Sequence, residues 1–163
     1  MTKMHLAQVN IGRVLGGPDD PRMADFYNNL AHINAMAERM PGFVWRLKDA
    51  EGSSAMALHW PGDATMAVNM TVWESDEALG KFVFQTVHRN IYARKQEFFE
   101  TPKTPTVAMW WIPAGHIPTL VEMGAAGGLS HDYHEFVERD MIGAGARVLA
   151  LMAIDVLGLA EEK

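Results

Sequence analysis

Residues 66–73, Met-Ala-Val-Asn-Met-Thr-Val-Trp, decide the fold, because their side chains alternate with a period of two and predict a β-strand. Residues 5–12, His-Leu-Ala-Gln-Val-Asn-Ile-Gly, alternate in the same way and predict another strand. Residues 43–47 and 106–112 predict two more, and residues 56–60 are a candidate for a short extended piece between turns. The chain therefore has at least four strands, with the clearest one in the middle.

Two amphipathic helices separate these strands. Asp20-Pro21 is a favourable helix start, and apolar residues recur at helical spacing from there to Pro41-Gly42. Ser75-Asp-Glu77 combines a capping residue with acidic side chains that suit a helix N-terminus. The apolar stripe of this second helix continues to Phe98, and Pro102 lies beyond its end. We therefore expect one helix after the first strand and one continuous helix after the third.

The resulting order, βαββαβ, predicts a ferredoxin-like α+β domain. Right-handed crossovers place the strands at residues 5–12 and 66–73 side by side at the centre of an antiparallel sheet. This domain spans residues 1–122. Residues 123–163 have a different sequence pattern. A Gly-rich linker at residues 124–128 precedes apolar residues at helical spacing over residues 133–160. We expect an extra C-terminal helix that covers either its own sheet or a partner subunit.

Composition narrows the classes of partner. The 163 residues fit one domain. The net charge of −6 argues against nucleic acid and against an anionic membrane, because both require a basic surface. No cysteine is present, which excludes disulfides and thiolate metal sites. The longest apolar run, residues 148–154, is too short to span a bilayer, and the first residues lack a signal-peptide pattern, so we expect a cytoplasmic protein.

The two faces of the central strands differ in polarity. One face is purely apolar, and we expect it to face the helices because amphipathic helices need an apolar surface. The other face mixes amides with an aromatic ring, which suits a cavity enclosed by a second sheet. Alternatively, its polar groups bond to one another or to water across a dimer interface. This second face carries Gln8, Asn10, Asn69, Thr71 and Trp73.

Other candidate ligand contacts lie outside the central strands. His88, on the second helix, suits a general base or a haem-iron ligand, although a lone helical histidine also suits a packed or solvated position. Arg46 beside Trp45 suits either an anion clamp or a surface cation–π pair. His116 lies in a loop close to Trp111, and both a ligand contact and a surface position are open there.

Metal and nucleotide motifs are weak or absent. His131, His134 and Glu138 share one face of the expected C-terminal helix, but such spacing is common on a solvated helix, so we predict no metal site. No G-x-G-x-x-G, Walker A or G-x-S-x-G sequence occurs, which leaves dinucleotide, P-loop and hydrolase functions without support.

Four segments of the chain resemble the domain of unknown function 3291 family. They are His5-Leu-Ala-Gln-Val-Asn10, Pro41-Gly-Phe-Val-Trp-Arg46, Val68-Asn-Met-Thr-Val-Trp-Glu-Ser75 and Trp110-Trp-Ile-Pro-Ala-Gly-His-Ile-Pro118. The resemblance covers about residues 4–122. It implies the dimeric α+β-barrel superfamily of antibiotic-biosynthesis-monooxygenase-like proteins, and thus a homodimer. That superfamily includes cofactor-independent monooxygenases, haem-degrading enzymes, haem dehydratases and simple ligand-binding modules.

The resemblance also implies roles for individual residues. The haem-degrading branch is similar in an Asn on the first strand and a His on the second helix, here Asn10 and His88, but Phe82 replaces that branch's Trp. We expect a cofactor-independent monooxygenase or isomerase that acts on an aromatic or polycyclic substrate. Asn10 and Asn69 would orient a substrate oxygen, His88 would move a proton, and Trp73 with Trp111 would wall the cavity. The alternatives are a haem-binding protein and a non-catalytic ligand-binding or oligomerisation module.

Overall fold

The computed structural model describes residues 2–48, 59–60, 63–103, 106–119 and 122. All four predicted strands and the helix starts are present, and the candidate extended piece contributes a two-residue strand. The elements are β1 (Met4–Arg13), a 3-10 helix η1 (Pro21–Met23), α1 (Ala24–Ala37), β2 (Phe43–Arg46), β3 (His59–Trp60), β4 (Asp63–Trp73), α2 (Asp76–Gln85), α3 (His88–Ala93), α4 (Lys95–Phe98) and β5 (Val107–Pro113).

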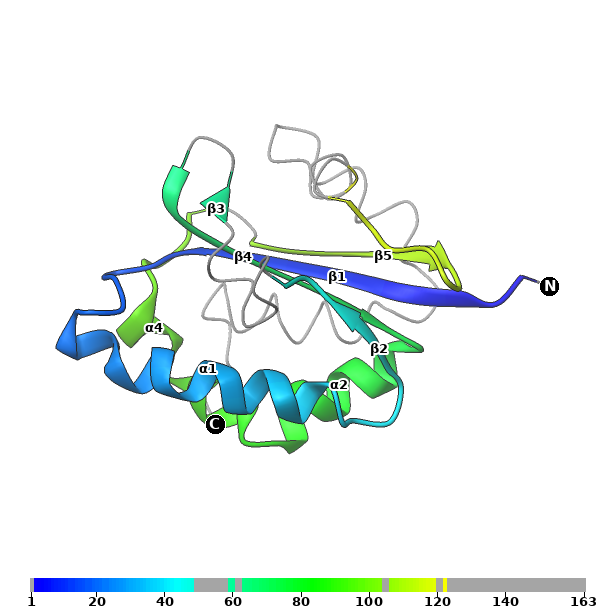
Figure 1. Ribbon diagram of the computed structural model, residues 1–163, viewed down its shortest axis with the longest axis horizontal. Coiled ribbons are helices and arrows are strands. Elements are labelled where there is room, and N and C mark those ends of the chain that lie inside the picture. The colour runs from blue at the N-terminus through cyan, green and yellow to red at the C-terminus, as the bar shows by residue number, and fades with distance from the viewer. Residues whose placement is uncertain (1, 49–58, 61–62, 104–105, 120–121, 123–163) are drawn as a thin grey trace, which may run out of the picture.

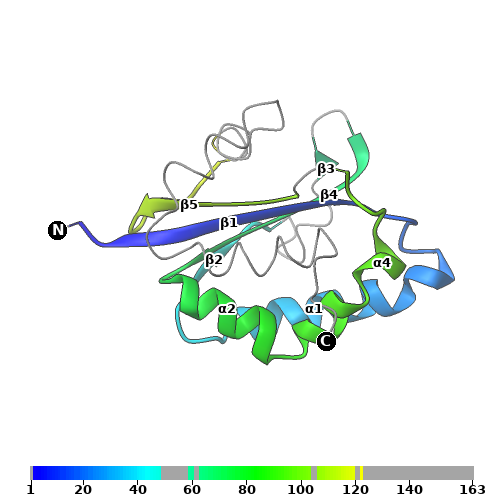
Figure 2. The ribbon, with the colours of Figure 1, turned by 180° about the vertical axis from the view of Figure 1, so that it is seen from behind.

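The strands form one antiparallel sheet with the order β2-β4-β1-β5, and β3 pairs with β4. The central pair is β1 and β4, as predicted, with Leu6 opposite Trp73 and Asn10 opposite Asn69. The edge strand β5 pairs with the other side of β1. Figures 1 and 2 show α1 and α2 on the same side of this sheet. The chain thus has the ferredoxin-like α+β architecture that its sequence predicts.

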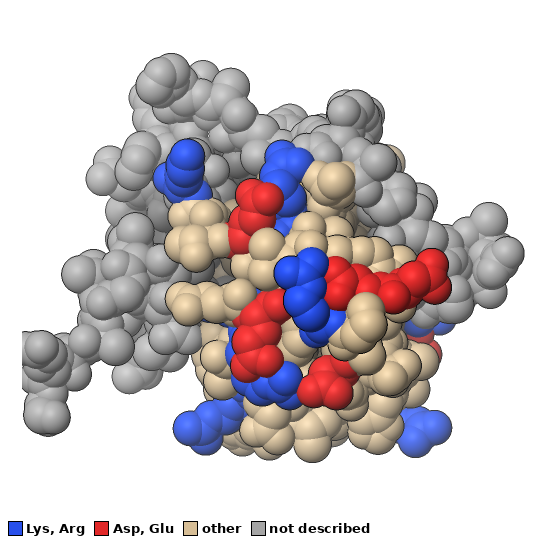
Figure 3. Space-filling model, turned by 90° about the vertical axis from the view of Figure 1, so that its left-hand side faces the viewer, with Lys and Arg blue, Asp and Glu red and all other residues tan. Residues whose placement is uncertain are grey.

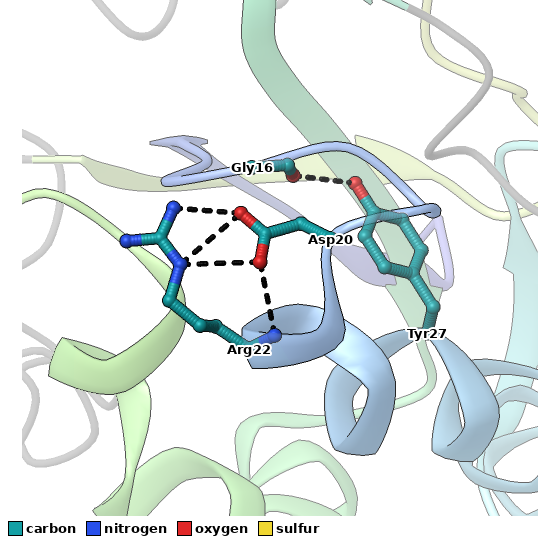
Figure 4. Close-up of polar contacts among 4 residues, drawn as sticks. All are labelled: Gly16, Asp20, Arg22 and Tyr27. Carbon is teal, nitrogen blue, oxygen red and sulfur yellow. Dashed lines mark hydrogen bonds and ion pairs between the residues drawn. The ribbon is translucent and has the colours of Figure 1, made fainter.

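An aspartate cap starts the first helical segment, as predicted (Figure 4). Asp20 Oδ1 accepts a hydrogen bond from the backbone N–H of Arg22 at 2.9 Å, and the Arg22 guanidinium binds the same carboxylate. The Tyr27 hydroxyl donates to the Gly16 carbonyl at 3.2 Å and holds the preceding loop against α1. The cap therefore satisfies a backbone donor that the helix itself leaves unpaired.

The second predicted helix is broken, so the prediction of one continuous helix is wrong. Thr86 adopts an extended backbone conformation directly after α2. Its hydroxyl donates to the Phe82 carbonyl at 2.6 Å and accepts from the His88 N–H at 3.2 Å. A threonine side chain can replace backbone partners in this way, which ends one helix and starts the next. The break gives His88 the first position of α3.

At the end of the molecule where α4 meets α1, acidic and basic side chains lie next to one another (Figure 3). Arg94 of the α3–α4 junction binds Asp25 of α1 at 3.0 Å and Glu97 at 2.7 Å. These pairs are largely exposed and contribute little stability. The aromatic rings of Phe26 and Phe98, with centroids 5.5 Å apart, provide the apolar contact between α1 and α4.

The helices cover the face that carries the polar residues, so the prediction that the purely apolar face meets them is wrong. Trp73 on β4 and Met109 on β5 extend from this face to α1 and α2. Such long side chains bridge the gap between a sheet and a helix layer, whereas short ones leave it unfilled. The buried cluster between the sheet and the helices contains Leu6, Ala37, Trp73, Leu79, Phe82, Val83 and Met109.

The opposite sheet face, on which none of the described helices lies and which is called the helix-free face below for that reason, carries small and β-branched side chains that suit a flat pleated surface. Among the described residues, its buried clusters are built from strand residues alone, with Trp45 and Trp110 packed against them. The buried members are Ala7, Val9, Val68, Met70, Val72, Ala108 and Ile112.

The predicted linker and C-terminal helix, residues 123–163, lie outside the described residues, as do His131, His134 and Glu138. The domain boundary after residue 122 stays a prediction. No helix in the described part of the chain is long and apolar enough to cross a membrane.

We predict that Gly42→Ala destabilises the fold more than Gly115→Ala. Both glycines have a positive φ, +83° and +89°, which costs an alanine about 1–2 kcal/mol. At Gly42 the added methyl would also lie 2.6 Å from the Ala78 side chain, whereas nothing lies within 4 Å at Gly115. Overpacking of this kind adds roughly 1–3 kcal/mol. Urea unfolding followed by circular dichroism measures both losses, and equal losses would contradict the prediction.

Candidate functional site

Five polar side chains on the helix-covered face form one continuous set of hydrogen bonds, which we call the amide network. Trp73 Nε1 donates to Thr71 Oγ1 at 2.9 Å, and Thr71 Oγ1 donates to Gln8 Oε1 at 3.0 Å. Gln8 Nε2 donates to Asn10 Oδ1 at 3.1 Å, and Asn69 Nδ2 donates to the same oxygen at 2.9 Å. The pairing of β1 with β4 places these residues side by side.

Exposure rises along the amide network from Trp73 towards the two asparagines. Trp73 is 0% exposed, Gln8 5% and Thr71 6%, while Asn10 and Asn69 are half-buried. A ligand can therefore reach the network at its asparagine end, and the three buried members are not accessible as direct contacts. This separates the five predicted ligand-binding residues into two groups, one accessible and one supporting.

The asparagine pair has hydrogen-bonding capacity left over. Asn10 Oδ1 already accepts two hydrogen bonds, and an amide oxygen has two lone pairs. Asn10 Nδ2 and Asn69 Oδ1 make no hydrogen bond within the described part of the chain. The open end thus presents N–H donors from Asn10 next to a carbonyl acceptor from Asn69.

His88 is a half-buried titratable group on the helix-covered side of the sheet. Its ring lies 4.9 Å from the Phe82 ring and stacks on Tyr92 at 6.2 Å, and Nδ1 is buried without a hydrogen-bond partner. Burial lowers the pKa of the imidazole, and a backbone hydrogen bond with Val83 offsets this only in part. The imidazole is therefore neutral at pH 7 and can accept a proton.

The chain path places His88 on the same side of the sheet as the amide network. Phe82 of α2 stacks on Trp73 with centroids 5.3 Å apart, at one end of the β1–β4 pair. Phe99, just after α4, forms a bridge with Val14 just beyond the other end of β1. The helical segment between these anchors therefore runs along β1. His88, the first residue of α3, lies next to the Phe82 ring that stacks on Trp73, and therefore on the side of the sheet that carries the amide network.

Two predicted ligand contacts on β2 do not join this site. Trp45 packs on the helix-free face. Arg46 points the other way, but it is buried and its Nε donates to Glu38 Oε1 at 2.7 Å, where Lys48 Nζ also binds at 2.8 Å. Lys48 and Arg46 together lower the pKa of the Glu38 carboxyl. Arg46 thus anchors β2 to the end of α1, and the structure does not offer it to an anion.

Trp111 and His116 also lie apart from the asparagines. Trp111 sits opposite Leu6 on the edge strand and is 38% exposed, at the far end of β1 from Asn10. His116 Nε2 lies 2.7 Å from Glu122 Oε1, and Glu122 makes reciprocal hydrogen bonds with Thr119, the pattern of a helix capping box. His116 therefore belongs to a surface turn.

Phe82 and Tyr92 flank His88. Phe82 entered the sequence analysis only as the replacement for the Trp of the haem-degrading branch, and neither residue was predicted as a ligand contact. The signal for Tyr92 is its spacing of four residues from His88, which places the two rings on one helix face. The contact between Phe82 and His88 depends on the helix break at Thr86, and helical spacing does not predict that break. The Phe82 ring fills the layer between the imidazole and Trp73, so a haem plane does not fit beside His88 there.

No group of three or more metal-binding side chains gathers anywhere in the part of the chain that the structure describes. The described side chains of the site are the amides, the aromatic rings and the half-buried imidazole of His88.

Several solved structures are similar to this chain in fold. SnoaB, a cofactor-independent oxygenase from Streptomyces nogalater, is 20% identical, with a TM-score of 0.45 over 69% of this chain and 95% of that chain. A protein of unknown function from Nitrosomonas europaea is 12% identical, with a TM-score of 0.47 over 73% of this chain and 99% of that chain. No curated protein matches the chain.

The resemblance of the four sequence segments to a known family is confirmed by the family comparison. The family described as "Domain of unknown function (DUF3291)" matches residues 5–126, which include every strand and helix described above except Met4, the first residue of β1. The chain belongs to the domain of unknown function 3291 family.

Proposed function

We propose that this protein is a small-molecule enzyme that acts without a cofactor on an aromatic or polycyclic substrate, as a monooxygenase or an isomerase. The observation that carries the proposal is the combination of a half-buried neutral imidazole, His88, with the unpaired N–H donors of Asn10 on the same side of the sheet. One group can take a proton from a carbon atom, and the other can stabilise the negative charge that develops on a neighbouring oxygen.

The substrate class follows from what these groups can do. A neutral imidazole removes a proton from carbon only if that C–H is acidic, as it is next to a carbonyl in an aromatic framework. The His88 imidazole would take this proton, and Asn10 Nδ2 would donate to the oxygen of the resulting enolate. Asn69 Oδ1 would accept from a neighbouring hydroxyl. The rings of Phe82 and Tyr92 beside the imidazole keep the reaction away from water, which strengthens these polar contacts.

Either reaction type balances without a cofactor. In isomerisation, His88 returns the proton to a different carbon atom. In oxygenation, the carbanion reduces O₂ and forms a C–O bond, and the resulting hydroperoxide takes the proton back and loses water to leave a new carbonyl. For the probe anthrone, anthrone and O₂ give anthraquinone and water. The protein then supplies a base, hydrogen-bond donors and a dry surface.

We also propose that two copies associate through the helix-free face to form the α+β barrel that the family resemblance implies. The described helices lie on the other side of the sheet, and the strand residues that face away from them are mostly apolar. Trp110 on this face is half-buried, so part of its ring is available for contact with a second copy.

We predict that the protein converts anthrone to anthraquinone and that His88→Gln lowers kcat/KM about 10²–10⁴-fold, the usual contribution of a general base. Since burial lowers the pKa of His88, the wild-type rate should fall on the acidic side with a midpoint below the ordinary value of 6.5. His88→Gln should lack this acidic limb. Oxygen uptake and absorbance measure the rate of conversion and its dependence on pH.

His32→Gln is the matched control, because His32 is an exposed histidine on α1. It should leave rate and pH profile unchanged. Binding of anthrone and anthraquinone without turnover would favour the non-catalytic ligand-binding module instead. If neither compound bound, both functions would be contradicted.

We predict that the protein has twice the chain mass of 18.1 kDa in solution and that Trp110→Lys lowers the mass towards that of one chain. Trp110 lies on the helix-free face, where a charge would have to be buried between subunits. Trp111→Lys, one residue along on the other face, should retain the dimer. Light scattering on folded variants measures this, and a monomeric wild type or equal effects would argue against the interface.

A further inference from the structure

The hydrogen bonds of the amide network have a direction that its innermost member determines. The indole Nε1–H of Trp73 can only donate. Thr71 Oγ1 accepts this hydrogen bond and so directs its single proton to the next partner, Gln8 Oε1. Because Gln8 turns its oxygen towards Thr71, it turns Nε2 towards Asn10.

The direction continues to the open end of the network. Asn10 faces a donor from Gln8 and a second donor from Asn69, so its oxygen must point inwards. Rotation of the Asn10 amide alone would set its N–H groups against two other N–H groups. Partly buried donors that lose their acceptors are unfavourable, so the single orientation is retained.

We infer that Trp73, Thr71 and Gln8 are positioning residues that fix the Asn10 side chain with Nδ2, and not Oδ1, towards a ligand. They act through Asn10 and do not touch the ligand, in keeping with their burial. The inference rests on the proposed function only in placing the ligand at Asn10. It makes the site selective for acceptor groups, such as carbonyl oxygens and enolates, over groups that can only donate.

Two substitutions remove the direction while leaving most of the packing. Thr71→Val is nearly isosteric and breaks the link between the indole and Gln8. Trp73→Phe retains a ring against Phe82 but removes the donor that determines the direction. In either variant, Gln8, Asn10 and Asn69 should rotate together and populate both orientations, because neither arrangement of the three amides then satisfies more hydrogen bonds than the other. Thr71→Ser retains the hydroxyl and is the matched control.

Neutron diffraction from deuterium-exchanged crystals distinguishes the amide nitrogen from the oxygen and gives the occupancy of each orientation. We expect one orientation of Asn10 in the wild type and in Thr71→Ser, and about half occupancy of each orientation in Thr71→Val and Trp73→Phe. Full retention of one orientation in both of these variants would overturn the inference. If Thr71→Val does not fold, Trp73→Phe decides.

Binding of anthraquinone, whose oxygens only accept hydrogen bonds, provides a second readout. The dissociation constant should rise about twofold in Thr71→Val, because the apparent affinity scales with the fraction of molecules that present the correct atom. Thr71→Ser should match the wild type. If anthraquinone does not bind the wild type, the proposed function fails while the diffraction result still decides the inference. If Asn10 changes orientation but affinity does not, the orientation has no role in binding and the positioning role is wrong.

Discussion

The register between β1 and β4 is the constraint on which the rest of the structure depends. It places Leu6 opposite Trp73, Gln8 opposite Thr71 and Asn10 opposite Asn69. A slip of one residue would turn every side chain of one strand to the other face, separate the amides and expose Trp73. The same register therefore builds the apolar contact with α1 and α2 at one end of the strands and the amide network along the rest. Core and candidate site cannot vary independently here.

The alternating pattern of the central strands was sufficient to predict the sheet, its central pair and the five residues that share the polar face. It was not sufficient to predict which face the helices cover. The number of apolar residues on each face favoured the face that the described helices do not cover. Such a count gives Val and Ala the same weight as the longer side chains that reach a helix. The Trp73 side chain, for example, reaches from the sheet to the Phe82 ring of α2. Side-chain length at facing positions is information that strand periodicity does not contain.

The candidate site was less predictable than the fold for a second reason. His88 depends on the break at Thr86, where a side-chain hydroxyl competes with the backbone for the Phe82 carbonyl. Helical spacing continues through this point, so periodicity shows no interruption. For Arg46 the sequence lacked the partner of the side chain. A guanidinium on a strand suits an anion clamp, but here it binds Glu38 at the end of α1. Such partners belong to other parts of the sequence, so the pattern around a single residue does not reveal them.

A buried polar network and a ligand site place different demands on the same side chains. Stability requires each buried donor and acceptor to be paired, because a half-satisfied network costs more than an apolar core. Binding requires some groups to remain unpaired. This protein meets both demands by position: pairing is complete at the buried end around Thr71, and spare capacity lies at the half-buried asparagines. Because the hydrogen bonds are directional, the buried end also determines which atoms remain spare. In the positioning role inferred above, the donor-only indole of Trp73, packed in the core, would limit the chemistry of ligands that bind at Asn10.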